Sequence, residues 1–173
     1  MHESAQEIEE LQKLLDRSYT GGGVHLRRVI TPARRVTAEE LVQRLTGMRL
    51  LVLATVTADG RPIVGPVDGV LYRGSFHFGS APDSVRFRHI RARPHVSATH
   101  LPEEEFAVTV HGRAVEVDVR ATEGAGLRKA LLDIYTPRYG PEWEAFLDGG
   151  PGENDAPVYA RIEAEKMFTF HMA

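Results

Sequence analysis

The sequence predicts a mainly β protein with peripheral helices, an α+β fold of about six strands and three or four helices. Short apolar or alternating runs recur through the middle and the end of the chain, and they have the length and pattern of strands. Asp59 and Gly60 separate two of these runs in the way that a hairpin turn does. Segments with helical spacing stand before, between and after the runs, and no segment repeats internally.

Two helical patterns precede the first predicted strand. Residues 3–18 place apolar side chains on one helical face, and residues 21–23 are three glycines that predict a flexible linker. Thr37 and Glu40 have the spacing of a capping box, which predicts the start of a second helix. We therefore separate residues 1–36, an N-terminal helix and linker extension, from the rest of the chain.

The predicted strands follow in chain order. They cover residues 50–57, 62–72, 75–78, 95–100 and 106–119, with closing strands at 158–164 and 167–171. Gly65, Pro66 and Gly69 interrupt the second of these runs, which predicts an irregular strand. Glycine at such a place lets a planar ring approach the backbone, and equally it accommodates a bulge at a barrel corner.

Two helices are expected between the fifth strand and the closing strands. Residues 123–135 carry apolar side chains on one helical face. Residues 141–147 form a shorter pattern that holds the only tryptophan, Trp143, which we interpret as a packing residue. A glycine-rich loop over residues 149–152 follows.

Residues 79–97 combine hydroxyl groups, a predicted helix start and a guanidinium in a short space. Asp83 is a favoured N-cap type, so the helix is expected to begin at Ser84. The unpaired N–H groups and the dipole of a helix start favour an anion, which Ser80, Ser84 and Arg86 can reach. The alternative is an ordinary capped helix with solvated arginines, in which the carboxylate of Asp83 occupies the helix end.

Four segments resemble motifs of one known family. They are ATVTADGRP at residues 54–62, SVR at 84–86, RPHVS at 93–97 and HGRA at 111–114. In this order they are similar to the opening hairpin, the phosphate-binding turn and two later strand motifs of the pyridoxamine-phosphate-oxidase-like superfamily. This superfamily of split β-barrel flavoproteins includes flavin and deazaflavin oxidoreductases, and the resemblance runs from Leu50 to Val119.

The resemblance implies a six-stranded, FMN-binding-like split β-barrel of Greek-key type over residues 37–173. It also implies a homodimer with two equivalent clefts at the subunit interface, which bind FMN or alternatively the deazaflavin coenzyme F420. Ser84 and Arg86 would hold the cofactor phosphate, with Ser80 beside them and Arg88 as a second basic position. The isoalloxazine ring would run along Val64, Gly65, Pro66, Val67 and Asp68. The resemblance also implies an alternative to packing for Trp143, since aromatic residues of this region can approach the cofactor cleft of the neighbouring subunit.

Two departures from the family pattern argue against vitamin B6 as the substrate. Val85 replaces a basic residue beside the phosphate, and residues 168–173 lack the Arg-Leu-x-Pro tail of the true oxidases. The expected activity is therefore an oxidoreductase that transfers hydride or electrons to another small molecule. No side chain is assigned as catalytic, and Asp68, Tyr72 and His111 are only candidates to line the substrate side. The alternative is a protein that stores, carries or senses flavin, F420 or haem without turnover.

Composition excludes several other classes. The chain has 173 residues, no cysteine and a formal net charge of −3, so thiol chemistry is absent and redox chemistry falls to a bound cofactor. No apolar run is long enough to span a bilayer, and the acidic start lacks an apolar signal region, so a cytoplasmic location is expected.

Metal and nucleic-acid sites are weaker hypotheses. The chain has eight histidines, but His95 and His100 are five apart on one predicted strand and point to opposite faces, so no metal site is predicted. A basic helix would carry Arg86, Arg88, Arg91 and Arg93. Aromatic stacking positions are sparse, however, and residues 103–105 are acidic, so no nucleic-acid partner is predicted.

Overall fold

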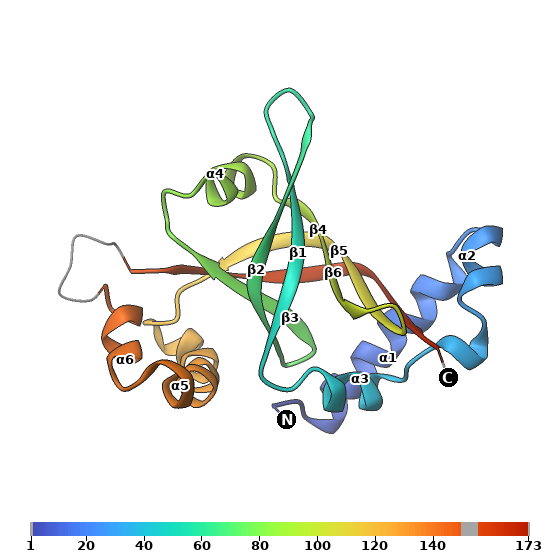
Figure 1. The fold of residues 1–173 in the computed structure, drawn as a ribbon, viewed down its shortest axis with the longest axis horizontal. Helices are drawn as coiled ribbons and strands as arrows, with labels where there is room; N and C mark the ends of the chain where they lie inside the picture. Colours follow the sequence, from blue (N-terminus) through green and yellow to red (C-terminus); the bar gives the residue numbers. More distant parts are fainter. Residues whose placement is uncertain (1, 150–155, 173) are drawn as a thin grey trace.

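The computed structural model describes residues 2–149 and 156–172. Six antiparallel strands close into a barrel in the order β1-β2-β3-β6-β5-β4, which confirms the predicted six-stranded fold (Figure 1). The strands are β1 (Met48–Val56), β2 (Pro62–Tyr72), β3 (Ser75–Ser80), β4 (His95–Glu103), β5 (Phe106–Val117) and β6 (Val158–His171). The helices are α1 (Ala5–Thr20), α2 (Val24–Val29), α3 (Ala38–Arg44), α4 (Val85–Ala92), α5 (Ala125–Tyr139) and α6 (Glu142–Leu147), with 3₁₀ turns at Pro32–Arg34 and Thr122–Gly124.

The structure corrects the prediction for two strands. The two closing strands are one continuous strand, β6, which pairs with β5 along its length around a register shift near Gly112. The predicted irregularity of β2 is also wrong, because its pairing with β1 runs unbroken from Val70 to Pro62. Gly69 serves packing instead, since a Cβ there would overlap the side chain of Leu51.

Helices differ from the prediction mainly at their ends. A short helix, α2, follows the three glycines, where only a linker was predicted. The helix α5 continues past Tyr135 and through Pro137 to Tyr139. The capping box of Thr37 and Glu40 is confirmed, with reciprocal hydrogen bonds of 2.9 and 3.2 Å. The predicted loop at 149–152 lies, except for Gly149, outside the described residues.

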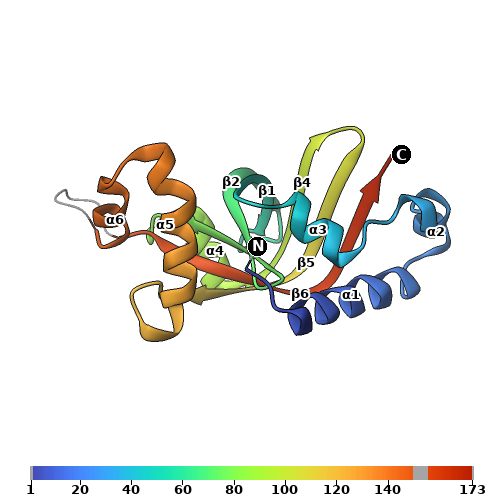
Figure 2. The same cartoon turned by 90° about the horizontal axis from the view of Figure 1, so that it is seen from below.

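The first helix is part of the barrel's own core. Leu11, Leu14 and Leu15 are buried in the main apolar cluster, and α1 runs along β6 (Figure 2). At the end of α1, the hydroxyl of Tyr19 lies 2.6 Å from that of Thr169 and accepts a hydrogen bond from the backbone N–H of Thr169. The α1 residues that make these contacts belong to the segment 1–36, which the sequence analysis assigned to an extension. The domain boundary itself stays a prediction.

A second apolar cluster lies where α5 and α6 cover the end of the barrel away from α1 (Figure 1). It joins Val70 of β2 and Tyr159 of β6 to the inner faces of Leu131 and Tyr135 on α5 and of Leu147 on α6. These two helices therefore form a wall beside β2, β3 and β6.

His77 is a buried histidine whose titration should be visible in stability. Its Nδ1 donates a hydrogen bond to the carbonyl of Ser75 at 3.0 Å, and burial lowers its pKa to about 4. In the unfolded chain this histidine protonates near pH 6.5. We therefore expect the unfolding free energy to be highest above pH 6.5 and to decrease as the pH drops towards 4, by up to about 3 kcal/mol. Urea titrations across this range would measure it, and a His77→Phe variant with the same pH slope would contradict it.

Candidate functional site

The barrel is split along one edge of β2. β3 pairs with β2 only from Gly69 to Tyr72, and then β3 turns away to pair with β6 from His77 to Ser80. Residues 62–68 of β2 therefore have no neighbouring strand on that side. Pro66 suits this free edge because it has no N–H to donate to a neighbouring strand.

Arg86 fills the split from the first turn of α4. Its Nη2 donates to the carbonyl of Pro66 at 3.2 Å, and its Nη1 donates to the hydroxyl of Ser80 at 3.3 Å. No ion pair to a carboxylate is present for Arg86 among the described residues, and burial lowers its pKa. A half-buried guanidinium that has only neutral oxygen partners retains a full positive charge for an anion.

The start of α4 differs from the prediction. Ser84, not Asp83, is the N-cap, and its hydroxyl accepts the N–H of Phe87 at 3.3 Å. Asp83 is exposed and lines the larger pocket described below. The hydroxyl of Ser84 is thus already engaged at the helix end, and the Asp83 carboxylate does not cap the helix.

A small pocket of about 200 Å³ lies on one side of Arg86. Val64 and Gly65 of β2 form one wall, and Ser84 and Arg86 form the other. A Cβ at Gly65 would lie 3.2 Å from Nη2 of Arg86, so glycine leaves room there for the guanidinium. The alternative of a bulge is wrong, because the pairing of β2 with β1 is continuous, and the approach of a planar ring to this backbone stays a prediction.

A larger pocket of about 430 Å³ is linked to Arg86 through Ser80, which lines the pocket and accepts a hydrogen bond from the guanidinium. Asp68 and Ser80 come from the barrel, while Tyr135, Trp143 and Phe146 come from α5 and α6. The ring of Trp143 lies 4.6 Å from that of Tyr135 and 4.8 Å from that of Phe146. Trp143 therefore lines a pocket as well as packing, and sequence reasoning missed these aromatic residues as a group. The sequence did contain a signal for an aromatic group: Tyr135, Tyr139 and Trp143 are four residues apart, a spacing that places side chains on one helical face.

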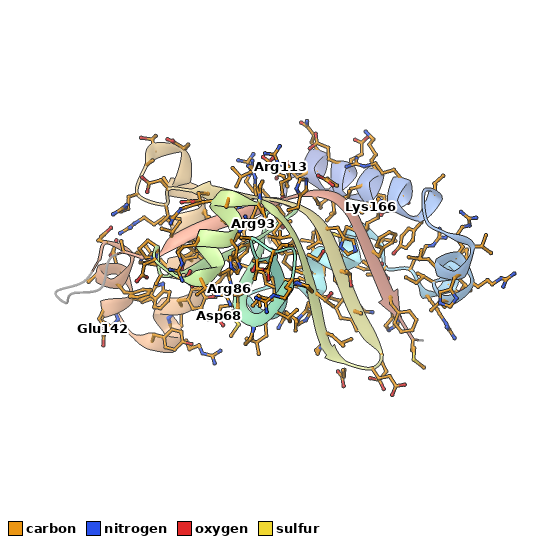
Figure 3. All side chains as sticks on the ribbon, turned by 90° about the horizontal axis from the view of Figure 1, so that it is seen from above. Asp68, Arg86, Arg93, Arg113, Glu142 and Lys166 are labelled. Atoms are coloured by element: carbon orange, nitrogen blue, oxygen red, sulfur yellow. The ribbon has the colours of Figure 1, made fainter. Side chains whose placement is uncertain are left out.

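The structure brings most of the predicted cofactor residues together, with two exceptions. Arg86, Ser80, Ser84 and the β2 positions Val64, Gly65, Pro66 and Asp68 line the two pockets or bond Arg86 at the split. Figure 3 labels Arg86 and Asp68 among these side chains. Val67 is buried in the barrel core, because side chains alternate along a strand and its neighbours face outward. Arg88 is exposed, and no hydrogen bond or ion pair joins it to the described residues of either pocket.

Two candidates for the substrate side lie elsewhere. Tyr72 packs its ring against His77 at 5.7 Å, and His111 shares a hydrogen bond of 2.7 Å with the hydroxyl of Ser97. Neither lines the larger pocket, whereas Asp68 does. Within residues 2–149 and 156–172, no group of three histidines or carboxylates is placed to bind a metal ion. No helix in that part of the chain is long and apolar enough to cross a membrane, and the cytoplasmic location stays a prediction.

The split six-stranded barrel with peripheral helices places this chain in the class of flavin-binding split β-barrels. The model of the family described as pyridoxamine 5'-phosphate oxidase matches residues 37–151, more than half of the sequence. The chain belongs to the pyridoxamine 5'-phosphate oxidase family, and the resemblance seen in its motifs is confirmed. Among curated proteins, no match is found.

Solved structures share the fold at low sequence identity. The conserved hypothetical protein Rv2991 from Mycobacterium tuberculosis has a TM-score of 0.64 and 20% identity, covering 81% of this chain and 88% of its own. A FAD-binding protein from Mesorhizobium loti has a TM-score of 0.55 and 24% identity, covering 79% and 93%. An F420 reductase has a TM-score of 0.52 and 23% identity, covering 71% and 91%. At these levels of identity, the similarities show a shared fold.

Proposed function

We propose that this protein is an oxidoreductase that binds FMN, or alternatively coenzyme F420, in the split beside β2 and transfers hydride or electrons to a small molecule. The observation that carries the proposal is Arg86, a half-buried guanidinium whose hydrogen bonds go to the neutral oxygens of Pro66 and Ser80. Such a group stabilises a phosphate strongly because its charge is partly desolvated. The FAD-binding and F420-reducing neighbours support a cofactor of this type.

The residues around the split fit a phosphorylated ring cofactor. Arg86 and Ser80 would hold the phosphate, and the N–H groups at the start of α4 would add to the positive potential there. Val64 is 60% exposed and, with Gly65 and Pro66, offers an apolar edge for a flat ring. When bound, the flavin supplies the acceptance and donation of hydride or single electrons. The chain supplies position, positive charge and an apolar surround.

We further propose that the working form is a homodimer with the cofactor at the subunit interface. The outer face of β1 carries Leu50 and Val52, which are 58% and 49% exposed, and β4 adds Leu101 at 59%. An apolar sheet face of this kind typically marks a protein interface. Val52 pairs directly with Pro66, whose carbonyl accepts from Arg86, so a partner on this face would lie next to the split.

The visible absorption spectrum tests the cofactor. The protein as purified, and after separate additions of FMN and F420, should show a bound flavin or deazaflavin band that remains after gel filtration. A Soret band would instead indicate haem, and no bound chromophore in any sample would contradict the proposal.

Turnover separates the oxidoreductase from a carrier. A reductase should accelerate the oxidation of NADPH, NADH or reduced F420 above the rate with free cofactor at the same concentration. Tight binding without acceleration would favour the non-catalytic alternative, a protein that stores, carries or senses the cofactor.

Replacing Val52 with glutamate should separate the subunits and weaken FMN binding. A carboxylate on the apolar face costs several kcal/mol if it is buried at an interface without a partner. Sedimentation velocity would measure the oligomeric state, and equilibrium dialysis would measure bound FMN. A glutamate at exposed Val24 on α2, far from the split, is the matched control. A proven monomer that keeps full FMN affinity would contradict the shared cleft.

A further inference from the structure

The larger pocket, which shares Ser80 with the hydrogen bond of Arg86, has an acidic and aromatic lining. The charged residues that line it, among those described, are Asp68 and Asp83, and both are carboxylates. No ion pair between described residues includes either of them. Arg86, whose guanidinium bonds Ser80 and Pro66, is reserved for the cofactor phosphate under the proposed function. Arg138 is near enough to act on the pKa of Tyr135, but it does not line the pocket. The charged lining among the described residues is therefore negative.

The walls of the pocket are aromatic faces and edges. Trp143 lies between Tyr135 and Phe146, with ring centroids 4.6 and 4.8 Å away, and Tyr159 closes the barrel side. Burial raises the pKa of both Tyr135 and Tyr159, and the charge of Asp68 raises each further. The phenols stay neutral at ordinary pH, so the charge of the pocket is that of its carboxylates alone.

A carboxylate among aromatic rings selects for a particular ligand chemistry. The ring faces attract a cation through their quadrupoles, and they attract it more strongly when water is excluded. An anion would be repelled by Asp68 and Asp83, and a small inorganic cation would keep its water and gain little from the rings. A volume of about 430 Å³ accommodates a metabolite-sized molecule.

We propose that this pocket binds an organic cation, an amine or quaternary ammonium with an apolar body, through Asp68 and the rings of Tyr135, Trp143 and Phe146. Ser80 lines the pocket and also bonds Arg86, so the cation would lie next to the cofactor. That the cation is the substrate rests on the proposed function. That the cation binds here does not rest on it, because residues of this chain form the pocket without a cofactor.

The sole tryptophan makes the pocket directly measurable. Because Trp143 is the only tryptophan, its fluorescence in flavin-free protein reports ligand at this wall. Benzyltrimethylammonium should quench or shift the emission saturably, and benzyl alcohol and benzoate should bind at least tenfold more weakly. Asp68→Asn, which keeps the side-chain shape, should weaken the cation about tenfold and should leave benzyl alcohol unchanged. Asp16→Asn, at an exposed position of α1, is the matched control and should change neither.

Three results would overturn the inference. The first is equal binding of the cation, the alcohol and benzoate. The second is no saturable binding of the cation. The third is cation binding that Asp68→Asn leaves unchanged while circular dichroism shows an intact fold.

A separate titration decides the substrate role. FMN is titrated by its own visible absorption with and without saturating benzyltrimethylammonium. Unchanged or tighter FMN binding supports two ligands side by side, and competition overturns the assignment of the cation as substrate. If FMN does not bind at all, the proposed function fails, while the tryptophan titration still decides whether the pocket takes a cation.

Discussion

Replacing Arg86 with alanine is expected to raise the dissociation constant for FMN by about tenfold or more. The guanidinium sits in the split with hydrogen bonds to Pro66 and Ser80, and no carboxylate among the described residues neutralises it. A charge-assisted hydrogen bond contributes about 1.5 to 3 kcal/mol, and each 1.4 kcal/mol is tenfold in affinity. Titration of the flavin absorption band, or calorimetry, would measure the change.

Arg88→Ala is the matched comparison for this variant. Arg88 lies on the same helix and was predicted to be a second basic contact, but its side chain is exposed and makes no recorded contact with the split. We expect it to change the affinity by less than about twofold, since long-range effects of exposed charges are screened. The opposite order, with Arg88 important and Arg86 dispensable, would move the phosphate to the outer face of α4.

Arg86→Lys adds a geometric test. A lysine keeps the charge but cannot reach Pro66 and Ser80 with two parallel donors. We expect an affinity between those of the unaltered protein and Arg86→Ala. Full affinity with lysine would show that charge alone, without the fork of donors, holds the cofactor.

Replacing Leu15 with alanine is expected to lower the unfolding free energy by about 2 to 5 kcal/mol. Leu15 is fully buried between α1 and the barrel, in the main apolar cluster. Removing a buried leucine side chain loses its transfer free energy and leaves a cavity that the barrel cannot close. Urea denaturation followed by far-ultraviolet circular dichroism would measure the midpoint and slope.

The same experiment tests whether residues 1–36 belong to the folding unit. Val24→Ala on α2 is the control, because Val24 is 59% exposed and its loss should change stability by less than about 0.5 kcal/mol. A Leu15→Ala protein as stable as the control would indicate that α1 is a detachable extension. A single cooperative transition with a large loss would show that α1 and the barrel unfold together.

The sequence predicted the elements that local chemistry controls. The capping box at Thr37 and Glu40 and the hairpin at Gly60 formed where they were expected, and each predicted strand lies within or overlaps an observed one, although the two closing strands are continuous. Their signals depend on neighbours within a few residues, which a single sequence displays in full. The order of four motifs also pointed to the family that the chain belongs to.

Errors arose where one local signal competed with another. Asp83 and Ser84 are both good N-caps, and the structure places Ser84 at the cap, where its hydroxyl accepts the N–H of Phe87. A proline and two glycines in β2 predicted irregularity, yet continuous pairing with β1 overrode them. The close packing of Gly69 on Leu51 cannot be read from either residue alone.

By itself, then, the sequence determined a six-stranded barrel with capped helices, and it predicted an anion site at the arginine in the first turn of α4, Arg86. Tertiary structure alone decided that β3 leaves β2 after Gly69, so that Arg86 reaches the free carbonyl of Pro66. It also decided that Trp143 and Tyr135 face Asp68 across a pocket. The physical reason is that Arg86 lies 20 positions from Pro66, and Asp68 lies on β2, far in sequence from Tyr135 and Trp143. Only barrel closure with the docking of α5 and α6 brings them to one site.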